Sequence, residues 1–335
     1  MSESQKYNVE DTSSARLEVS AKGAERFRQS GIGLSAHWGL YSLSTRGTEW
    51  IYFNERIPLD VYRERLRSFN PTRFCAEEWA DLMLEAGLKF LLITSKHHDG
   101  FCLWDTRYTE FKVTNTPFKR DILAELAQAL RERNLGLHFY YSLVDWTHPA
   151  YRLDWPAYVT YYQDQIRELC THFGPISGFI FDGYWPRNPL DADGMQEYFA
   201  PRGAWDLAGA YDLIHQLQPD AMVANNTHIL PLQGEDYQVW ELDLPGENKI
   251  GFNCTEIGDK PTACWWNLNA GWSYQPWNHN VKSAEEIFAT YRAVRARDAV
   301  FFLNVGPRPF GDIHPEEQQV LRQIGQAIHR DLCKG

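Results

Sequence analysis

The sequence lacks the features that direct a chain to a membrane, to secretion or to a zinc centre. No stretch approaches the roughly 18 apolar residues that a membrane helix needs, and the polar segment from Met1 to Ser20 has no apolar centre of the kind found in signal peptides. The six cysteines are scattered and form no Cys-x-x-Cys pair, which favours free thiols in a reducing compartment. We therefore expect a cytoplasmic protein without a membrane partner.

Basic residues are fewer than acidic ones. The chain has 33 Lys and Arg residues against 44 Asp and Glu residues, which gives a net charge of -11. This balance disfavours nucleic acid and anionic membranes as partners. The G-x-G-x-x-G, Walker and G-x-S-x-G sequences are missing too, which argues against a nucleotide-binding doubly wound sheet and against a serine nucleophile.

Apolar runs typical of buried strands alternate with amphipathic helical runs along most of the chain. The strand-like runs are 31–36, 88–94, 136–141, 176–182, 221–224 and 299–306, and the helical runs are 76–86, 121–133, 155–172, 206–217, 283–298 and 315–330. This alternation predicts an α/β fold, a (β/α)8-like TIM barrel over residues 24–335 after a tail or cap at 1–23. Two of the eight strands are hard to place. They fall in the Trp- and Gly-rich region 226–282, where we expect long loops over the active face.

Polar or titratable side chains follow several of these predicted strands. They are His37, His97 with His98, Tyr141 with Asp145 beyond it, Asp182, Asn225 with Asn226, and Asn304. The carboxyl ends of barrel strands open into one mouth, so a barrel would bring these groups together. Asp182 ends an apolar run and is a candidate nucleophile or general base, although Asp followed by Gly183 is equally typical of a turn.

Two kinds of chemistry suit this set of residues. His37, His97, His98 and Asp182 are types that bind metal ions, but adjacent histidines on an extended strand point in different directions. We therefore expect no metal, and no cofactor. Glycoside hydrolysis instead needs two carboxylates beside groups that bind hydroxyls. It also suits a chain in which aromatic residues make up 14% of the total, with 13 Trp.

Six segments, in order along the chain, resemble glycoside hydrolase family 29, the α-L-fucosidases. They are Ala36–Ser42, Gly47–Trp50, Thr94–Trp104, Phe139–Ser142, Phe181–Gly183 and Leu303–Pro307. The K-H-H-D-G-F-x-L-W run from Lys96 to Trp104 is highly specific, and the other segments gain weight from their order. The resemblance runs from about Gly31 to His329. It implies a retaining α-L-fucosidase that acts on a fucosylated oligosaccharide or glycoside.

The same resemblance implies roles for individual residues. Asp182 matches the nucleophile that forms a covalent fucosyl-enzyme. The positions that match fucose-binding residues are His37, Glu49, Trp50, His97, His98 and Tyr141. Structural roles remain open for some of them, since His97, His98 or Trp50 could belong to the core and Glu49 could pair with Arg46. Trp272, within an aromatic cluster at 265–274, is a further expected substrate contact.

The general acid/base is harder to assign. The segment 234–245 resembles the family stretch D-Y-x-T-P-E-x-x-I-P and aligns Glu241 with its glutamate. Burial beside Trp240 and Leu242 would raise the pKa of Glu241, as a general acid requires. A second family stretch is only partly kept at 260–274, where no carboxylate replaces the expected Glu. The competing carboxylates are Glu256, Asp236, Glu235 and Glu247. This departure also leaves open a non-catalytic fucose-binding barrel, or a glycosidase for a related sugar.

The length of the chain is the last departure from the family pattern. Many family members carry a β-sandwich domain after the barrel, and this sequence ends at Gly335, just after the last predicted helix. We therefore expect a barrel without a C-terminal β-sandwich domain. We also expect a homo-oligomer in which a neighbouring chain covers the mouth of the active site.

Overall fold

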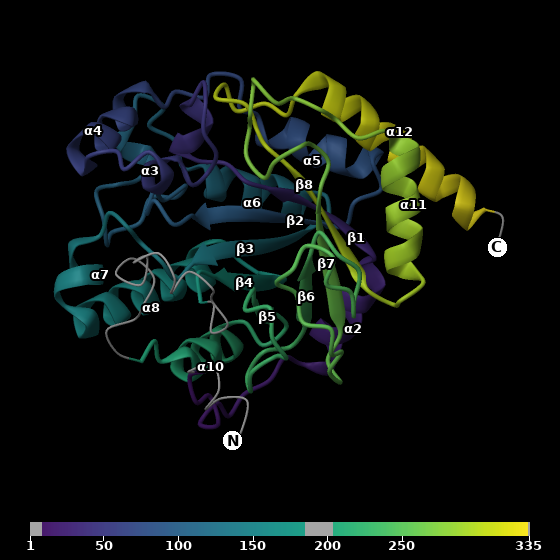
Figure 1. The fold of residues 1–335 in the computed structure, drawn as a ribbon, viewed down its shortest axis with the longest axis horizontal. Coiled ribbons are helices and arrows are strands. Elements are labelled where there is room, and N and C mark those ends of the chain that lie inside the picture. The colour runs from purple at the N-terminus through teal and green to yellow at the C-terminus, as the bar shows by residue number, and fades with distance from the viewer. Residues whose placement is uncertain (1–8, 185–203, 334–335) are drawn as a thin grey trace.

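The computed structural model describes residues 9–184 and 204–333. Its centre is an eight-stranded sheet in the order β5-β4-β3-β2-β1-β8-β7-β6, and all seven pairings are parallel (Figure 1). The strands are β1 (Ile32–Ala36), β2 (Phe90–Lys96), β3 (Gly136–Ser142), β4 (Gly178–Asp182), β5 (Met222–Asn225), β6 (Gln238–Glu241), β7 (Thr262–Asn267) and β8 (Val300–Val305). The predicted α/β barrel is confirmed, as a nearly closed one.

The barrel has a seam between β5 and β6, because the described residues form no ladder there. Asp236, two residues before β6, bridges this seam. Its backbone N–H donates to the carbonyl of Val223 on β5 at 2.7 Å, and its Oδ2 accepts from the N–H of Val223 at 2.7 Å. His215 Nε2 lies 2.8 Å from the same carboxylate oxygen. One aspartate thus replaces part of a missing strand pairing, since buried backbone groups need partners.

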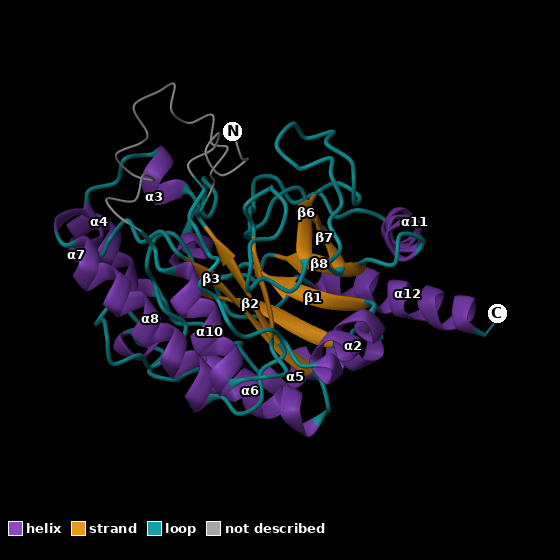
Figure 2. Cartoon of the chain, turned by 90° about the horizontal axis from the view of Figure 1, so that it is seen from below, coloured by secondary structure: helices purple, strands orange, loops and turns teal. Residues whose placement is uncertain are grey.

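Helices cover the outside of the strands (Figure 2). The longer ones are α2 (Ala21–Ser30), α5 (Ala76–Glu85), α6 (Ile122–Glu132), α8 (Trp155–His172), α10 (Leu207–Leu217), α11 (Ala284–Arg295) and α12 (Pro315–Leu332). Shorter ones are α3 (Ile51–Asn54), α4 (Leu59–Arg63), α7 (Pro149–Leu153), η1 (Leu40–Leu43), η2 (Glu64–Ser68) and η3 (Val113–Asn115). Side chains of Asp121, Asp154 and Ser283 accept backbone N–H groups and start α6, α8 and α11. Within the described residues, no helix is long and apolar enough to cross a membrane.

The strands that the sequence left unplaced are β6 and β7, and both lie in the region 226–282. The six strands and six helices that were predicted are present, with ends shifted by up to three residues. The N-terminal segment is bonded to the barrel: the N–H groups of Arg16 and Leu17 donate to Asp212 at 2.9 Å, and α2 begins at Ala21.

Strand alternation separates two apolar layers. One fills the barrel and includes Tyr140, Ile180, Trp265 and Phe302, and the other lies between strands and helices and includes Tyr141. Successive residues of a strand point to opposite faces of the sheet. On β3, Tyr140 therefore points into the barrel and Tyr141 points away from it, which decides which tyrosine can reach the mouth.

Candidate active site

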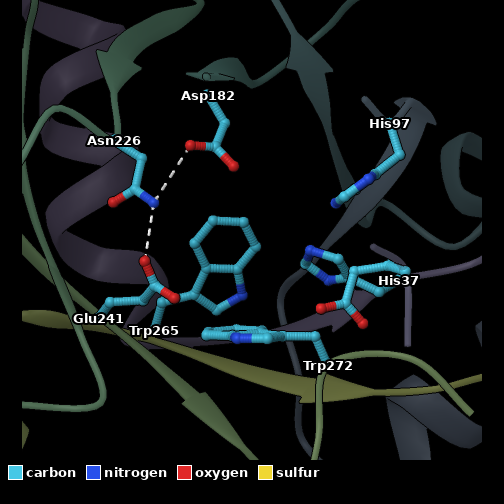
Figure 3. A pocket seen from close by; sticks show the side chains of 8 residues that line it. His37, His97, Asp182, Asn226, Glu241, Trp265 and Trp272 are labelled. Carbon is cyan, nitrogen blue, oxygen red and sulfur yellow. Dashed lines mark hydrogen bonds between the residues drawn. The ribbon is translucent and has the colours of Figure 1, made fainter. Parts of the chain in front are cut away.

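A pocket with a volume of about 40 Å³ opens at the carboxyl ends of the strands (Figure 3). It is lined by His37, Glu49, His97, Asp182, Asn226, Glu241, Trp265 and Trp272. These residues come from β4, β6 and β7 and from the segments that follow β1, β2, β5 and β7. The structure therefore brings together most of the residues that the sequence singled out, in the place where TIM barrels carry their active sites.

Asp182 is the last residue of β4 and is 8% exposed. Its Oδ2 accepts the hydroxyl of Tyr140 at 2.8 Å, and its Oδ1 accepts the N–H of Gly183 at 2.8 Å. Asn226 Nδ2 lies 3.5 Å from the same Oδ1. Donors from three strands or strand ends therefore fix the orientation of this carboxylate toward the pocket, and the turn at Gly183 supplies one of them.

Glu241 ends β6 and faces Asp182 across the pocket (Figure 3). Its Oε2 accepts a hydrogen bond from Asn226 Nδ2 at 2.9 Å. Burial raises the pKa of Glu241 to about 8; the Asn226 hydrogen bond opposes this shift, and the negative charges of Asp182 and Glu49 add to it. Glu241 is thus protonated at neutral pH, which is the state that a general acid needs.

Asn226 fixes the separation of the two carboxyl groups. One amide nitrogen is 3.5 Å from Asp182 Oδ1 and 2.9 Å from Glu241 Oε2. These two oxygen atoms are no farther apart than the sum of those distances. The two carboxyl groups are therefore close enough to act on the same sugar, as glycoside hydrolysis requires.

The four other carboxylates considered for the acid/base role lie outside the pocket. Asp236 bridges the β5–β6 seam. Glu235 is buried and accepts the Tyr211 hydroxyl at 2.7 Å. Glu247 pairs with Lys249 and Arg297 at the surface, and Glu256 is exposed. Of the five candidates, Glu241 alone lines the pocket with Asp182.

Two histidines line the pocket as neutral imidazoles. Burial lowers the pKa of His37 to about 4, against a smaller opposing effect of its hydrogen bond to Asn304. Burial also lowers the pKa of His97 well below its ordinary value, and the neighbouring His98 adds to that shift. The His97 ring stacks on Tyr140 with 5.3 Å between centroids. A neutral imidazole can donate one hydrogen bond and accept another, which suits a sugar hydroxyl.

His98 and Trp50 lie just behind this pocket wall. His98 Nε2 is 3.8 Å from Asp182 Oδ2, and its Nδ1 is 2.6 Å from Ser142 Oγ. Burial lowers the pKa of His98 well below its ordinary value. Trp50 packs edge-on against the His98 ring at 5.1 Å. His98 therefore lies beside Asp182, Trp50 packs on His98, and neither residue lines the pocket itself.

Glu49 and Trp272 reach the pocket from loops. Glu49 is 6% exposed and accepts the Ser273 hydroxyl at 2.8 Å; burial raises its pKa. It forms no ion pair with Arg46 among the described residues. Trp272 lies 5.2 Å from His37 and 5.0 Å from Trp265 between ring centroids. The two tryptophans give the pocket an apolar floor.

The expectation for Tyr141 is wrong. Tyr141 points away from the barrel interior, is fully buried, and donates its hydroxyl to Gln165 of α8 at 2.7 Å. Its neighbour Tyr140 occupies the pocket side and bonds Asp182. Strand parity could have identified this, because Tyr140 and Ser142 lie on one face, and Ser142 pairs with Asp182 in the register of β3 and β4.

The metal hypothesis gains no support from the geometry. Among the described residues, the group of three that brings ligand atoms within 4.8 Å of one another is His279, His314 and Glu316, which lies away from this pocket. His37 instead contacts Asn304 through Nδ1 at 2.8 Å and packs beside Trp272, and His97 stacks on Tyr140.

The family model for α-L-fucosidase matches residues 1–331 of this chain. Among curated relatives, α-L-fucosidase 1 of Arabidopsis thaliana is 29% identical over 77% of this chain, and tissue α-L-fucosidase of Homo sapiens is 25% identical over 90% of it. The chain spans 52% of the length of the plant protein and 66% of that of the human protein.

Solved structures agree with this match. α-L-Fucosidase isoenzyme 1 from Paenibacillus thiaminolyticus has a TM-score of 0.78 at 29% identity, over 92% of this chain and 76% of that one. A second structure is that of a family 29 α-L-fucosidase from Bacteroides thetaiotaomicron, trapped as a covalent intermediate with 2-fluoro-fucosyl fluoride. It has a TM-score of 0.78 at 27% identity, over 94% of this chain and 76% of that one. AlfC from Lactobacillus casei shares the fold over 93% of this chain and 99% of its own, with a TM-score of 0.74 at 23% identity. With a barrel of this form and a family model matched over nearly its whole length, the chain belongs to the α-L-fucosidase family, glycoside hydrolase family 29.

Proposed function

We propose that this protein is a retaining α-L-fucosidase that hydrolyses terminal α-L-fucosyl linkages of oligosaccharides or glycosides. The observation that carries the proposal is the pairing of Asp182 and Glu241 in one pocket, with Asn226 Nδ2 in reach of both. Retention of configuration is supported by the family 29 α-L-fucosidase from Bacteroides thetaiotaomicron that was trapped as a covalent intermediate. Family membership and the pocket's hydroxyl-binding groups support fucose as the sugar.

In the first step, Asp182 acts as the nucleophile. Its carboxylate attacks the anomeric carbon and forms an ester bond, while the bond from that carbon to the leaving oxygen breaks. Protonated Glu241 gives its proton to the leaving oxygen. In the second step, water attacks the anomeric carbon, Glu241 accepts the proton from the water, and Asp182 is released. Two inversions at one carbon return the original configuration.

Substrate binding would rest on the remaining pocket residues. His37, His97 and Glu49 carry donors and acceptors for ring hydroxyls, and Trp272 offers a flat apolar surface for the methyl-bearing face of fucose. His98 and Trp50 support the nucleophile side of the pocket, where His98 Nε2 is 3.8 Å from Asp182. Tyr140 takes the position that the sequence assigned to Tyr141.

The test is release of nitrophenol from 4-nitrophenyl α-L-fucoside by wild type, Asp182→Gly, Glu241→Gly and, as a control at an exposed carboxylate, Glu256→Gly. Asp182→Gly should lose turnover and, with azide, yield the β-fucosyl azide. Glu241→Gly with azide should yield the α-azide. Glu256→Gly should behave as wild type.

Other outcomes would redirect the assignment. Wild type that is inert but binds fucose would leave a non-catalytic fucose-binding barrel. Wild type that instead cleaves 4-nitrophenyl β-D-galactoside faster would move the specificity to a related sugar. If Asp182→Gly keeps its rate, the assignment of the nucleophile fails.

We further propose that the protein is a homo-oligomer in which a neighbouring copy covers the mouth of the pocket. Phe252, which is 43% exposed, packs on His228 near Glu241 and leaves an apolar ring at this mouth. Light scattering at micromolar concentration should give a mass above that of one chain, and a monomer would contradict the proposal.

A further inference from the structure

A network of hydrogen bonds lies beneath the pocket, and Asn304 of β8 is at its centre. Trp265 Nε1 donates to Ser35 Oγ at 2.9 Å, and Ser35 Oγ donates to Asn304 Oδ1 at 3.1 Å. His37 Nδ1 lies 2.8 Å from the same amide oxygen. Ser35 is 1% exposed and Asn304 is fully buried, so their polar groups must find partners within the protein.

The orientation of the Asn304 amide is fixed at both of its ends. Asn304 Nδ2 lies 2.7 Å from the backbone carbonyl of Trp272, and a carbonyl only accepts, so this end must be the nitrogen. At the other end, the indole N–H of Trp265 only donates, so Ser35 Oγ accepts from it and directs its own proton to Asn304. The amide oxygen therefore points toward His37.

This orientation determines which nitrogen of His37 carries the proton. Asn304 Oδ1 can only accept, so His37 Nδ1 must be the N–H that donates to it. Burial lowers the pKa of His37 to about 4, so at neutral pH the ring is neutral and Nε2 carries the lone pair. His37 lines the pocket (Figure 3), and within the described residues no side chain bonds its Nε2. His37 thus offers the pocket an acceptor and not a donor.

We propose that Asn304 is a positioning residue that holds His37 with its proton on Nδ1, so that Nε2 selects a sugar hydroxyl able to donate to it. The proposal rests on the proposed fucosidase function and names a requirement of its substrate. A hydroxyl can donate to Nε2, whereas a fluorine in its place has no proton to donate. A site built to bond a hydroxyl rejects analogues that lack it, because its own polar group is then left without a partner.

The same amide connects His37 to the apolar floor of the pocket. The ring centroids of Trp265 and Trp272 each lie 5.2 Å from that of His37. Asn304 bonds Trp272 directly through its carbonyl and Trp265 through Ser35. Replacing Asn304 could therefore shift the tryptophans as well as the proton of His37, and the experiment must distinguish these two effects.

The first measurement is the tautomer of His37 in the protein without substrate. Long-range nitrogen–proton NMR spectra of protein labelled in its histidines show which ring nitrogen carries the proton, and His37→Gln identifies the signals of His37. Wild type should carry the proton on Nδ1. Asn304→Asp keeps an oxygen acceptor and should keep this tautomer, whereas Asn304→Leu removes the acceptor and should lose it.

Asn267→Ala is the matched control. Asn267 Oδ1 accepts from Asn304 Nδ2 at 3.1 Å, and Asn267 is not bonded to His37. Its replacement removes one buried partner of Asn304 and leaves the bonds to Trp272 and Ser35 that fix the amide. The control should therefore show the same tautomer as wild type.

The second measurement is calorimetric binding of L-fucose and of its 2-, 3- and 4-deoxyfluoro derivatives. In wild type, each fluorine that replaces a donating hydroxyl should weaken binding about 10-fold. In Asn304→Leu, fucose itself should bind about 10-fold more weakly. One of the fluorine penalties should disappear in this variant, because the acceptor that caused it is lost, and the others should remain. Asn304→Asp should restore the wild-type ranking.

Two results would overturn the proposal. One is a wild-type His37 with its proton on Nε2. The other is an equal weakening of all four sugars in Asn304→Leu, which would mean that Asn304 only supports the shape of the pocket. Failure of the fucosidase function would look different: wild type would not hydrolyse 4-nitrophenyl α-L-fucoside, while the spectra would still show the proton on Nδ1 of His37.

Discussion

The two sides of this barrel are built differently. From β1 to β4 the strands have five to seven residues, and their pocket residues His37, His97 and Asp182 stand at or directly after the strand ends. On the other side β5 and β6 have four residues each, no ladder joins them, and Glu241 depends on loop residues Asn226 and Asn253 for its position. The regular side thus holds the proposed nucleophile with His37 and His97, and the irregular side holds the proposed proton donor.

Two buried glutamates sharpen the comparison within the irregular side. Burial raises the pKa of both Glu235 and Glu241 to about 8. Glu241 opens to the pocket, whereas Glu235 is enclosed beneath Tyr211. A raised pKa alone therefore does not identify a catalytic acid, since structural burial produces the same shift. Glu241 differs from Glu235 in its position at the mouth of the pocket, and not in its pKa.

The largest expected effect lies on the regular side. Asp182→Asn should reduce kcat/KM for 4-nitrophenyl α-L-fucoside by at least about 1,000-fold, because the amide cannot form the glycosyl ester. Steady-state kinetics together with circular dichroism would check this. A folded variant within 10-fold of wild type would contradict the division of roles between the two sides.

The next largest effect is expected from replacing Glu241, and Glu235 serves as its comparison. Glu241→Gln should lower kcat/KM for methyl α-L-fucoside by about 100-fold or more, because no proton reaches the leaving oxygen. In wild type, the rate should fall as the pH rises through about 8, the pKa at which Glu241 loses its proton. Glu235→Gln should keep both the rate and this basic limb. Equal losses in the two variants would show that burial, and not placement, determines their importance.

A smaller effect should separate adjacent tyrosines of β3. Tyr140→Phe removes the 2.8 Å hydrogen bond to Asp182 and should cost about 10-fold in kcat. Tyr141→Phe removes the hydrogen bond to Gln165 and should leave kcat within about 2-fold while destabilising the fold by about 1 kcal/mol. Steady-state kinetics and thermal unfolding of the two variants test this. A larger loss of kcat in Tyr141→Phe than in Tyr140→Phe would contradict the conclusion that Tyr140 faces the barrel interior.

The smallest effect is on stability. The pKa of Glu235 is raised from 4.5 to about 8 in the folded protein, so its contribution to stability is complete below pH 4.5 and is lost as the pH rises through about 8. Glu235→Gln removes this titration. Its Tm relative to wild type should therefore increase by a few degrees between pH 5 and pH 9. A constant difference across this range would mean that Glu235 is ionised in the folded protein.

The sequence predicted the regular side well and the irregular side poorly, for physical reasons. Strands such as Phe90–Lys96 can be recognised in the sequence as apolar runs, because they are buried on both faces of the sheet. Strand β6 has four residues and carries Gln238 and Glu241 among its apolar ones, so its pattern does not differ from that of a loop. Asp182 was identified from a strand end, and strand parity would have pointed to Tyr140 in place of Tyr141. The contacts of Asp236 across the seam are long-range, and no periodicity encodes them.

The seam at Asp236 has a consequence for how the molecule opens. Strands β5 and β6 are the two edges of the sheet, so ladder hydrogen bonds hold each of them from one side only, and across the seam the contacts of Asp236 with Val223 replace part of the missing ladder. Local opening starts where backbone groups have the fewest partners, and amide hydrogen exchange should therefore be fastest there among the strands. Warming would then disturb the strand that carries Glu241 before the one that carries Asp182, and the protein would lose its proposed proton donor while the proposed nucleophile is still in place.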